Sequence, residues 1–282
     1  MAERIQKLLA SAGVASRREA ERMIEQNRVS VNGKIVKLGD KAELTDTLRV
    51  DGKIIRLNRR PDAKHRVLVY HKPEGQICTR SDPEGRPTIY DQLPRLRSGR
   101  WIAVGRLDIN TSGLILLTTD GELANRLMHP SHEVEREYAV RVLGEVTEAT
   151  LRKLRKGVEL EDGMAKFNSI RDAGGQGANH WYHVTLNEGR NREVRRLWES
   201  QEIRVSRLSR VRYGPIMLRR GLKPGGWDEL ERTDINTLRK TAGMPPVESM
   251  DADKKSAKHR VSRPRKKPVK ARQQASPYKK RK

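Results

Sequence analysis

The stretch GRLDINTSGLILLTTDGELANRLMHP at residues 105–130 contains a polar loop, an apolar run and a helical pattern in close succession. The apolar residues 114–117 predict a buried strand, and residues 121–128 place apolar side chains at helical spacing. Because residues 101–104 form another apolar run, the loop joins two expected strands and can hold the carboxylate of Asp108 in a fixed position. The loop is also rich in turn formers, so its composition alone favours an ordinary turn at Asp108.

Short runs with strand character alternate with helical patterns from residue 67 to about residue 243. Besides those already named, strands are predicted at residues 67–70, 137–142 and 181–186, and helices at residues 150–156 and 192–199. Long crossover helices do not follow the strands regularly, which argues against a doubly wound parallel sheet. We therefore expect an α+β domain over residues 67–243, with a mixed or largely antiparallel sheet.

Residues 1–60 predict a separate small α/β module. Apolar residues at positions i, i+3 and i+4 indicate a helix over residues 4–10. A second helix is expected to begin at Ser16, where Ser-Arg-Arg-Glu forms a capping box. Residues 28–36 then predict two strands around an Asn-Gly turn, and residues 50–55 suggest a second hairpin.

The charge of the chain indicates a polyanionic partner. Its 60 Lys and Arg residues exceed its 36 Asp and Glu residues, giving a formal net charge of +24. Residues 254–282 contain 14 of these cations and no Asp or Glu, so residues 1–253 retain +10. A disordered basic tail is expected over residues 244–282, and a polar linker over residues 61–66. The tail is either a solubilising segment or a nonspecific phosphate-binding arm, and the basic character of the remaining chain favours the arm.

Several other classes of protein are disfavoured by the composition. No stretch approaches the ~20 apolar residues that a membrane-spanning helix needs, and the first residues, MAERIQKLLASAG, do not resemble a secretory signal. A single cysteine, Cys78, excludes an internal disulfide, and the histidines lack a metal-ligand framework. We expect a soluble cytoplasmic protein, a monomer by default, with no bound metal.

The N-terminal module resembles a known RNA-binding fold. The segment SRREAERMIEQNRVSVNGKIV at residues 16–36, in its helix–helix–hairpin order, is similar to the S4 RNA-binding domain, and the match covers nearly all of residues 3–57. A basic face that could contact RNA phosphates would consist of Arg4, Lys7, Arg17, Arg18 and Arg22. Such contacts position RNA without reading its bases. A solvated charged face is the alternative.

The larger domain resembles the pseudouridine synthases, in the rRNA branch that carries an N-terminal S4 domain. The motif at residues 105–130 looks like the active-site motif of that family. HKPEG at residues 71–75, EREYAVRV at residues 135–142 and EGRNREVRRL at residues 188–197 match its other motifs in the same order. The resemblance spans residues 3 to about 240, and four separate motifs make a chance agreement implausible.

Two further segments narrow the resemblance to the branch that acts on large-subunit rRNA. These are DPEGRPT at residues 82–88 and RWIAVGRLD at residues 100–108. The resemblance implies an isomerisation, without a cofactor, of a uridine in 23S rRNA near the peptidyl-transferase region. The substrate would be free rRNA or an assembly intermediate. The alternatives are a noncatalytic S4-type ribosome-assembly factor and a small-subunit relative.

The resemblance also assigns roles to four residues. Asp108 matches the catalytic aspartate, and Arg195 matches the arginine that pairs with it. Tyr138 matches the active-site tyrosine, and Arg106 the side chain that fills the base stack after the target uridine has left it. Whether the carboxylate adds to the ring, attacks C1′ or promotes a glycal stays open. Taken alone, Tyr138 is an ordinary core tyrosine, Arg195 a solvated helix arginine and Arg106 a partner in a salt bridge.

Further cations are candidates for contacts with RNA phosphates. Lys72, in the HKPEG motif, is one of them, although a surface lysine at the end of a strand is the alternative. A dense basic region that could line an RNA groove contains Arg190, Arg192, Arg196, Arg207, Arg210 and Arg212.

Overall fold

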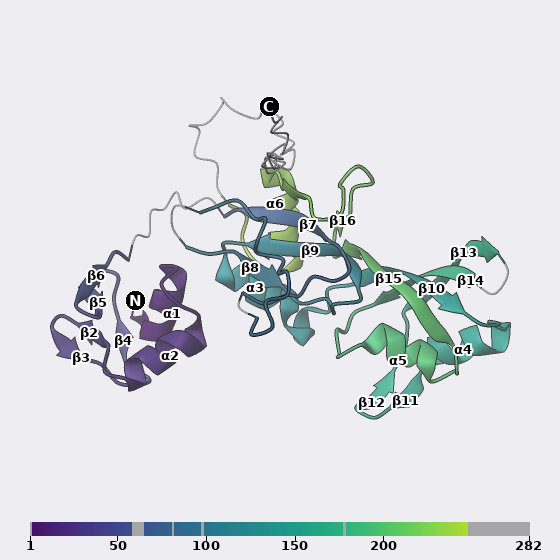
Figure 1. Ribbon diagram of the computed structural model, residues 1–282, viewed down its shortest axis with the longest axis horizontal. Helices are drawn as coiled ribbons and strands as arrows, with labels where there is room; N and C mark the ends of the chain where they lie inside the picture. The colour runs from purple at the N-terminus through teal and green to yellow at the C-terminus, as the bar shows by residue number, and fades with distance from the viewer. Residues whose placement is uncertain (1, 58–64, 81, 97–98, 177–178, 248–282) are drawn as a thin grey trace, which may run out of the picture. The chain divides into compact units, whose positions relative to one another are not determined.

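The computed structural model describes residues 2–57, 65–80, 82–96, 99–176 and 179–247 (Figure 1). The first of these ranges contains eight short elements: β1 (Glu3–Arg4), α1 (Ile5–Ser11), α2 (Arg17–Glu25), β2 (Val29–Val31), β3 (Lys34–Ile35), β4 (Lys41–Ala42), β5 (Leu48–Val50) and β6 (Lys53–Ile55). Strands β3, β2, β5 and β6 form one antiparallel sheet in that order, and β1 pairs with β4.

The local signals in this module produce the structure that they predict. The Ser16 side chain accepts a hydrogen bond of 3.1 Å from the Glu19 N–H, which caps α2. Asn32 and Gly33 both have positive φ, 51° and 85°, as a tight hairpin turn between β2 and β3 requires. The apolar faces of α1 and α2 are buried against the inner face of the sheet, where Val29 and Leu48 are fully covered.

A large mixed sheet forms the centre of the remaining described chain. Its strands are β7 (Val67–Lys72), β8 (Ile102–Val104), β9 (Ser112–Thr118), β10 (Arg136–Leu143), β13 (Ser169–Gln176), β14 (Asn179–Leu186), β15 (Arg204–Tyr213), β16 (Ile216–Met217) and β17 (Trp227–Glu229). The main path runs β13-β14-β10-β15-β9-β7-β17, with β8 beside β9 and β16 beside β15. Every pair is antiparallel except β15 and β9, which are parallel. This confirms the predicted α+β class with a mixed sheet.

Helices cover both faces of this sheet and create two hydrophobic cores (Figure 1). One core includes residues of α3 (Gly121–Met128) and α6 (Arg232–Thr241), and the other includes residues of α4 (Glu148–Lys156) and α5 (Glu193–Glu199). A 3-10 turn, η1 (Pro130–His132), and a small hairpin of β11 (Val158–Leu160) and β12 (Gly163–Ala165) complete the elements. Because β7 and β9 contribute alternate residues to both cores, they are continuous apolar runs in the sequence.

The ordered part of this domain extends further than the sequence predicted. Met244 and Val247 pack against the core that contains α3 and α6. The Val247 N–H donates a hydrogen bond of 2.8 Å to Asn236 Oδ1, and the Pro245 carbonyl accepts one of 2.6 Å from Arg239 Nε. The expected start of a disordered tail at residue 244 is therefore wrong, because residues 244–247 are tied to α6. The rest of the expected tail, residues 248–282, lies outside the described residues.

The expected linker is shorter at its C-terminal end. Arg66 forms a bidentate ion pair with Glu229 of β17, with nitrogen–oxygen distances of 2.6 and 2.8 Å. The Arg66 carbonyl accepts a hydrogen bond from the Thr118 hydroxyl at 3.0 Å. Arg66 thus belongs to the sheet, while residues 61–64 of the expected linker lie outside the described residues. Within the described ranges, no helix has both the length and the apolar character needed to cross a bilayer.

The N-terminus of α3 makes a pH-dependent contribution to stability. Burial alone would raise the pKa of Asp120, but hydrogen bonds from His65 and from the Leu123 and Glu122 N–H groups lower it to about 2. The unfolded carboxyl titrates near 3.8, so the stabilisation is complete above that pH and is lost as the pH falls through 2. Asp120→Asn is expected to cost about 2 kcal/mol of unfolding free energy at pH 7. Urea titrations at pH 7, 4 and 2.5 test this, and an undiminished gap between the two proteins at pH 2.5 would contradict it.

Candidate active site

The loop between β8 and β9 places Asp108 on a groove in the larger domain. The Asp108 carbonyl accepts a hydrogen bond of 3.1 Å from the Thr111 N–H, so the segment is indeed a turn, as its composition predicted. The half-buried Asp108 side chain lines the groove, together with Arg106, Tyr138, Arg192 and Arg210. The segment is therefore a turn that also presents a half-buried carboxylate to the groove.

A buried ammonium group supports this turn from the side of β7. Lys72 is fully buried, and its Nζ donates to the carbonyls of Thr111 at 2.7 Å, Asp108 at 2.9 Å and Pro73 at 3.0 Å. Burial lowers the pKa of Lys72, while the nearby acidic groups Cys78, Asp108 and Glu74 oppose that effect. The prediction that Lys72 contacts an RNA phosphate is wrong, because its ammonium is enclosed by loop carbonyls and does not reach the surface.

A buried guanidinium supports the same turn from α5. Arg195 is 6% exposed, and its Nη2 donates to the Asn110 carbonyl at 2.9 Å while its Nη1 donates to the Val205 carbonyl at 3.1 Å. Its Nε is buried and has no hydrogen-bond partner within the described chain. The expected ion pair with Asp108 is not formed in this structure. The two side chains are nevertheless electrostatic neighbours: burial and Arg192 lower the pKa of Arg195, and Asp108 opposes them.

Two further contacts hold the residues on either side of Asp108. The Cys78 thiol donates to the Leu107 carbonyl at 3.3 Å and accepts from the Leu107 N–H at 3.4 Å. Burial raises the pKa of Cys78, which keeps it a neutral thiol able to do both. The Gly75 N–H donates to the Ile109 carbonyl at 2.8 Å. Together with Lys72 and Arg195, these contacts restrain the loop along its length and hold the Asp108 backbone in one position.

Tyr138 and Arg106 both line the groove, but Tyr138 is buried and Arg106 is exposed. Tyr138 in β10 is 8% exposed and belongs to the core that includes residues of α5, yet it also lines the groove. Tyr138 is therefore both a core residue and a residue of the groove. Arg106 is exposed on the groove and forms no ion pair with any described residue. The alternative of a salt bridge for Arg106 is not supported by the described residues.

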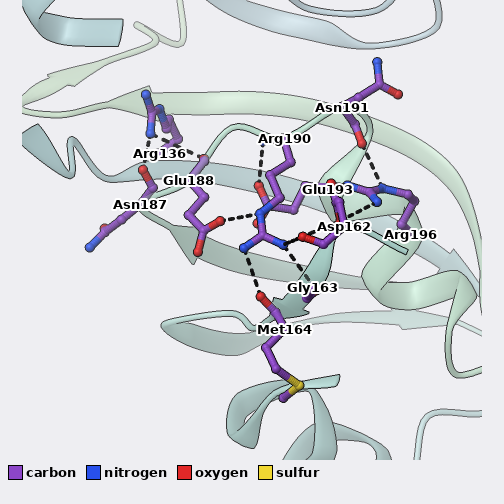
Figure 2. A network of polar contacts seen from close by, with 10 residues as sticks. All are labelled: Arg136, Asp162, Gly163, Met164, Asn187, Glu188, Arg190, Asn191, Glu193 and Arg196. Carbon is purple, nitrogen blue, oxygen red and sulfur yellow. Dashed lines mark hydrogen bonds and ion pairs between the residues drawn. The ribbon is translucent and has the colours of Figure 1, made fainter. Parts of the chain in front are cut away.

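Arg190 and Arg196 are engaged within the protein (Figure 2). Arg190 donates to Glu188 at 2.6 Å and to the carbonyls of Asp162, Gly163 and Met164 at 2.9 to 3.2 Å. Arg196 holds the Asp162 carboxylate through two bonds of 2.8 Å. These contacts tie the β11–β12 hairpin to the segment that precedes α5, which differs from the predicted role of both arginines in RNA binding. Arg192 is the exposed member of the group, on the groove at the start of α5.

The parallel junction between β9 and β15 depends on a glycine. Gly113 lies opposite Arg210 with φ of +108°, and a Cβ at this position would collide with the backbone N and O of Arg210. Gly113→Ala is therefore expected to cost about 3 kcal/mol of unfolding free energy. Gly105, with φ of +79° and no atom within 4 Å of a built Cβ, is the matched control. Gly105→Ala should cost about 1 kcal/mol, and equal midpoints of urea unfolding for the two variants would contradict the packing argument.

The five cations predicted for RNA contact in the N-terminal module all lie on its surface. Arg4, Arg17 and Arg18 are exposed and form no ion pair with a described residue. Lys7 pairs with Glu3 at 3.2 Å, and Arg22 pairs with Glu19 at 2.5 Å, in each case within about one helical turn. Such exposed pairs stabilise weakly, so RNA phosphates can replace them.

Comparison with known proteins identifies the family. The model of the RNA pseudouridylate synthase family matches residues 66–200, and that of the S4 domain matches residues 3–48. The ribosomal large subunit pseudouridine synthase B of Escherichia coli (strain K12) is 61% identical over 251 residues, which cover 88% of this chain and 86% of that protein. The chain belongs to the pseudouridine synthase family.

Other relatives agree with this membership. The synthase B of Haemophilus influenzae is 60% identical over 260 residues, covering 92% of this chain and 73% of that protein. A solved structure described as a pseudouridylate synthase is 27% identical, with a TM-score of 0.59, and the match covers 83% of this chain and 99% of that one. As a pseudouridine synthase, the protein is an isomerase that acts on RNA, and the predicted family is confirmed.

Proposed function

We propose that this synthase isomerises one uridine of 23S rRNA, near the peptidyl-transferase region, with Asp108 as the catalytic carboxylate. The observation that carries the proposal is the restrained turn at Asp108 on a groove lined by Tyr138 and arginines. The choice of large-subunit rRNA is supported by relatives of 60–61% identity that are named for it. It is also supported by the DPEGRPT segment at residues 82–88.

The isomerisation of uridine to pseudouridine needs a carboxylate held in a fixed position and no redox cofactor. Isomerisation breaks the N1–C1′ bond of the uridine and forms a C5–C1′ bond, while the proton of C5 is lost and N1 gains one. No electrons are gained or lost overall, so the proposal requires no redox cofactor. Asp108 acts at the sugar or the ring, and buried Lys72 and Arg195 keep the loop electropositive beside it.

Three further side chains would serve the everted nucleotide. A uridine must leave its stack to reach Asp108, at a cost of a few kcal/mol. The planar guanidinium of Arg106, which is exposed on the groove, would fill the gap that the base leaves behind. In the groove, the ring of Tyr138 would stack on the uracil, and its hydroxyl would assist removal of the C5 proton. Arg195 acts by positioning the turn and by its positive charge.

The N-terminal module would hold the RNA stem-loop through phosphates. Its exposed candidates are Arg4, Lys7, Arg17, Arg18 and Arg22. In the larger domain Arg192 adds an exposed cation at the groove, 3.7 Å from the carboxylate of Glu199. Such contacts supply affinity that falls with salt. The enzyme would act in the cytoplasm as a monomer, on free rRNA or on a large-subunit assembly intermediate.

Mapping of modified sites tests the proposal directly. We expect rRNA from a strain lacking this protein to gain one pseudouridine in 23S rRNA when it is incubated with the full chain. Because pseudouridine and uridine have the same mass, the site is mapped by carbodiimide labelling of pseudouridine and primer extension. A gain in 16S rRNA instead would favour the small-subunit alternative. Binding of rRNA with no pseudouridine formed on free rRNA or assembly intermediates would favour a noncatalytic assembly factor and would refute the proposal.

A further inference from the structure

Arg210 of β15 belongs to the basic region that the sequence predicts as a candidate for RNA contacts, and it brings a buried guanidinium to the groove. Arg210 is 3% exposed and lines the groove. In the register of the sheet it lies between Tyr138 of β10 and Gly113 of β9. Arg210 is thus a direct cross-strand neighbour of the tyrosine proposed to stack on the uracil.

The protein satisfies only part of this guanidinium. Arg210 Nε donates to the Leu114 carbonyl at 2.8 Å, and the guanidinium carbon lies 5.1 Å from the centre of the Tyr213 ring. Arg210 Nη2 is buried and has no hydrogen-bond partner. No carboxylate of the described residues forms an ion pair with it. A buried donor that stays unpaired costs free energy, and a buried charge costs more.

The neighbouring Arg136 differs from Arg210, because the protein supplies acceptors for its guanidinium. Arg136 approaches the same Tyr213 ring at 5.0 Å. Its Nη1 donates to the carbonyls of Asn187 and Glu188, and its Nη2 donates to the Tyr213 hydroxyl. The protein therefore satisfies Arg136, whereas Arg210, which lines the groove, keeps the buried donor Nη2 without a partner.

We propose that Arg210 is a substrate-binding residue, whose guanidinium donates to an acceptor oxygen of the everted nucleotide. The oxygen belongs to a uracil carbonyl or to a phosphate flanking the nucleotide, and either would complete the hydrogen bonds of Nη2. The proposal rests on the proposed function, because it assumes that a uridine enters this groove. Arg210 then fixes the nucleotide relative to Tyr138 and Asp108.

The first test compares two variants that remove the same charge from β15. Arg210→Gln is expected to lower the single-turnover rate on a stem-loop RNA roughly 10- to 100-fold, the usual effect of losing a hydrogen bond to a charged group. Arg204→Gln is the matched control, because Arg204 is exposed on the same strand and does not line the groove. It should keep the rate within about 3-fold, allowing for a weak electrostatic effect. Equal rates for the two variants would overturn the proposal.

The second test identifies the acceptor by altering the RNA. The target uridine is replaced with 2-thiouridine or 4-thiouridine, or a flanking phosphate with an uncharged methylphosphonate. With the unaltered protein, one of these changes should slow the reaction roughly 10- to 100-fold. The same change should slow Arg210→Gln less than about 3-fold, because the contact is already absent. Loss with a thio-base assigns the carbonyl, and loss with a methylphosphonate assigns the phosphate.

Equal slowing of both proteins by every altered RNA would overturn the proposal, since it would show no coupling between Arg210 and these oxygens. If Arg210→Gln does not fold, Arg210→Lys replaces it. The unaltered protein also remains a test by itself, because full rates on all altered RNAs would likewise overturn the proposal. Conversion of unmodified RNA by the unaltered protein is measured in parallel. Its absence refutes the proposed function rather than the role of Arg210.

Discussion

Asp108→Asn is expected to abolish pseudouridine formation, with a loss of roughly 10⁴-fold or more in single-turnover rate. The amide keeps the size of the side chain but removes the negative charge and the nucleophilic or basic oxygen. The backbone contacts of Lys72, Gly75 and Arg195 to the turn do not involve the Asp108 side chain. Folding and RNA affinity should therefore be retained. The measurement is release of tritium from rRNA labelled at uridine C5, together with the thermal midpoint and a binding titration.

The matched control is Asp172→Asn on β13, an exposed carboxylate that does not line the groove. It should keep full activity. If Asp108→Asn releases tritium as fast as the unaltered protein, the catalytic assignment is lost. If Asp108→Asn instead unfolds, Asp108 is needed for folding, and its assignment as the catalytic carboxylate is also contradicted.

Lys72→Met is expected to have the second largest effect, on stability and activity together. Methionine fills most of the space but removes the ammonium donor from the buried carbonyls of Pro73 and Thr111. The Asp108 carbonyl keeps only the hydrogen bond from the Thr111 N–H. The expected cost is about 3 kcal/mol of unfolding free energy. The same change should lower the single-turnover rate roughly 100-fold, because the turn that presents the carboxylate loses its support.

Urea unfolding and single-turnover kinetics measure the two effects of Lys72→Met. Lys153→Met, an exposed residue of α4, controls for removal of one positive charge and should leave both quantities unchanged. A variant at position 72 that is as stable as the unaltered protein but binds RNA poorly would restore Lys72 to the phosphate-binding set. It would also contradict the role that the structure gives it.

The fold was predictable where local chemistry agrees with packing. The capping box at Ser16 and the Asn-Gly turn at Asn32 are short-range signals, and both form as expected. The apolar run at residues 114–117 becomes a strand that is buried on both faces. The parallel contact of β9 and β15 was not predictable. It joins Gly113 to Arg210, 97 residues later, and it requires a residue without a side chain at position 113, which the pattern of apolar residues does not reveal.

The site was predictable in part for similar reasons. Asp108 and Tyr138 follow from motifs, and both lie on the groove. Lys72 was misassigned because a lysine at a strand end suggests a surface, yet it shares strand parity with Leu68 and Tyr70, whose side chains are buried. This alternation along the strand was the signal in the sequence that could have predicted a buried Lys72. For Arg190 the sequence offers only the nearby Glu188 as a partner, because its other hydrogen bonds go to backbone carbonyls of a distant hairpin (Figure 2).

The central claim is that the carboxylate at position 108 meets the sugar or ring of an everted uridine in the groove. The most direct measurement is a crystal structure of Asp108→Asn bound to its stem-loop RNA. We predict that the target uridine lies out of its stack with its ring against Tyr138, and that the side chain at position 108 lies within about 3.5 Å of the reacting atoms. A target uridine still paired in the stem, or seated away from position 108, would contradict it.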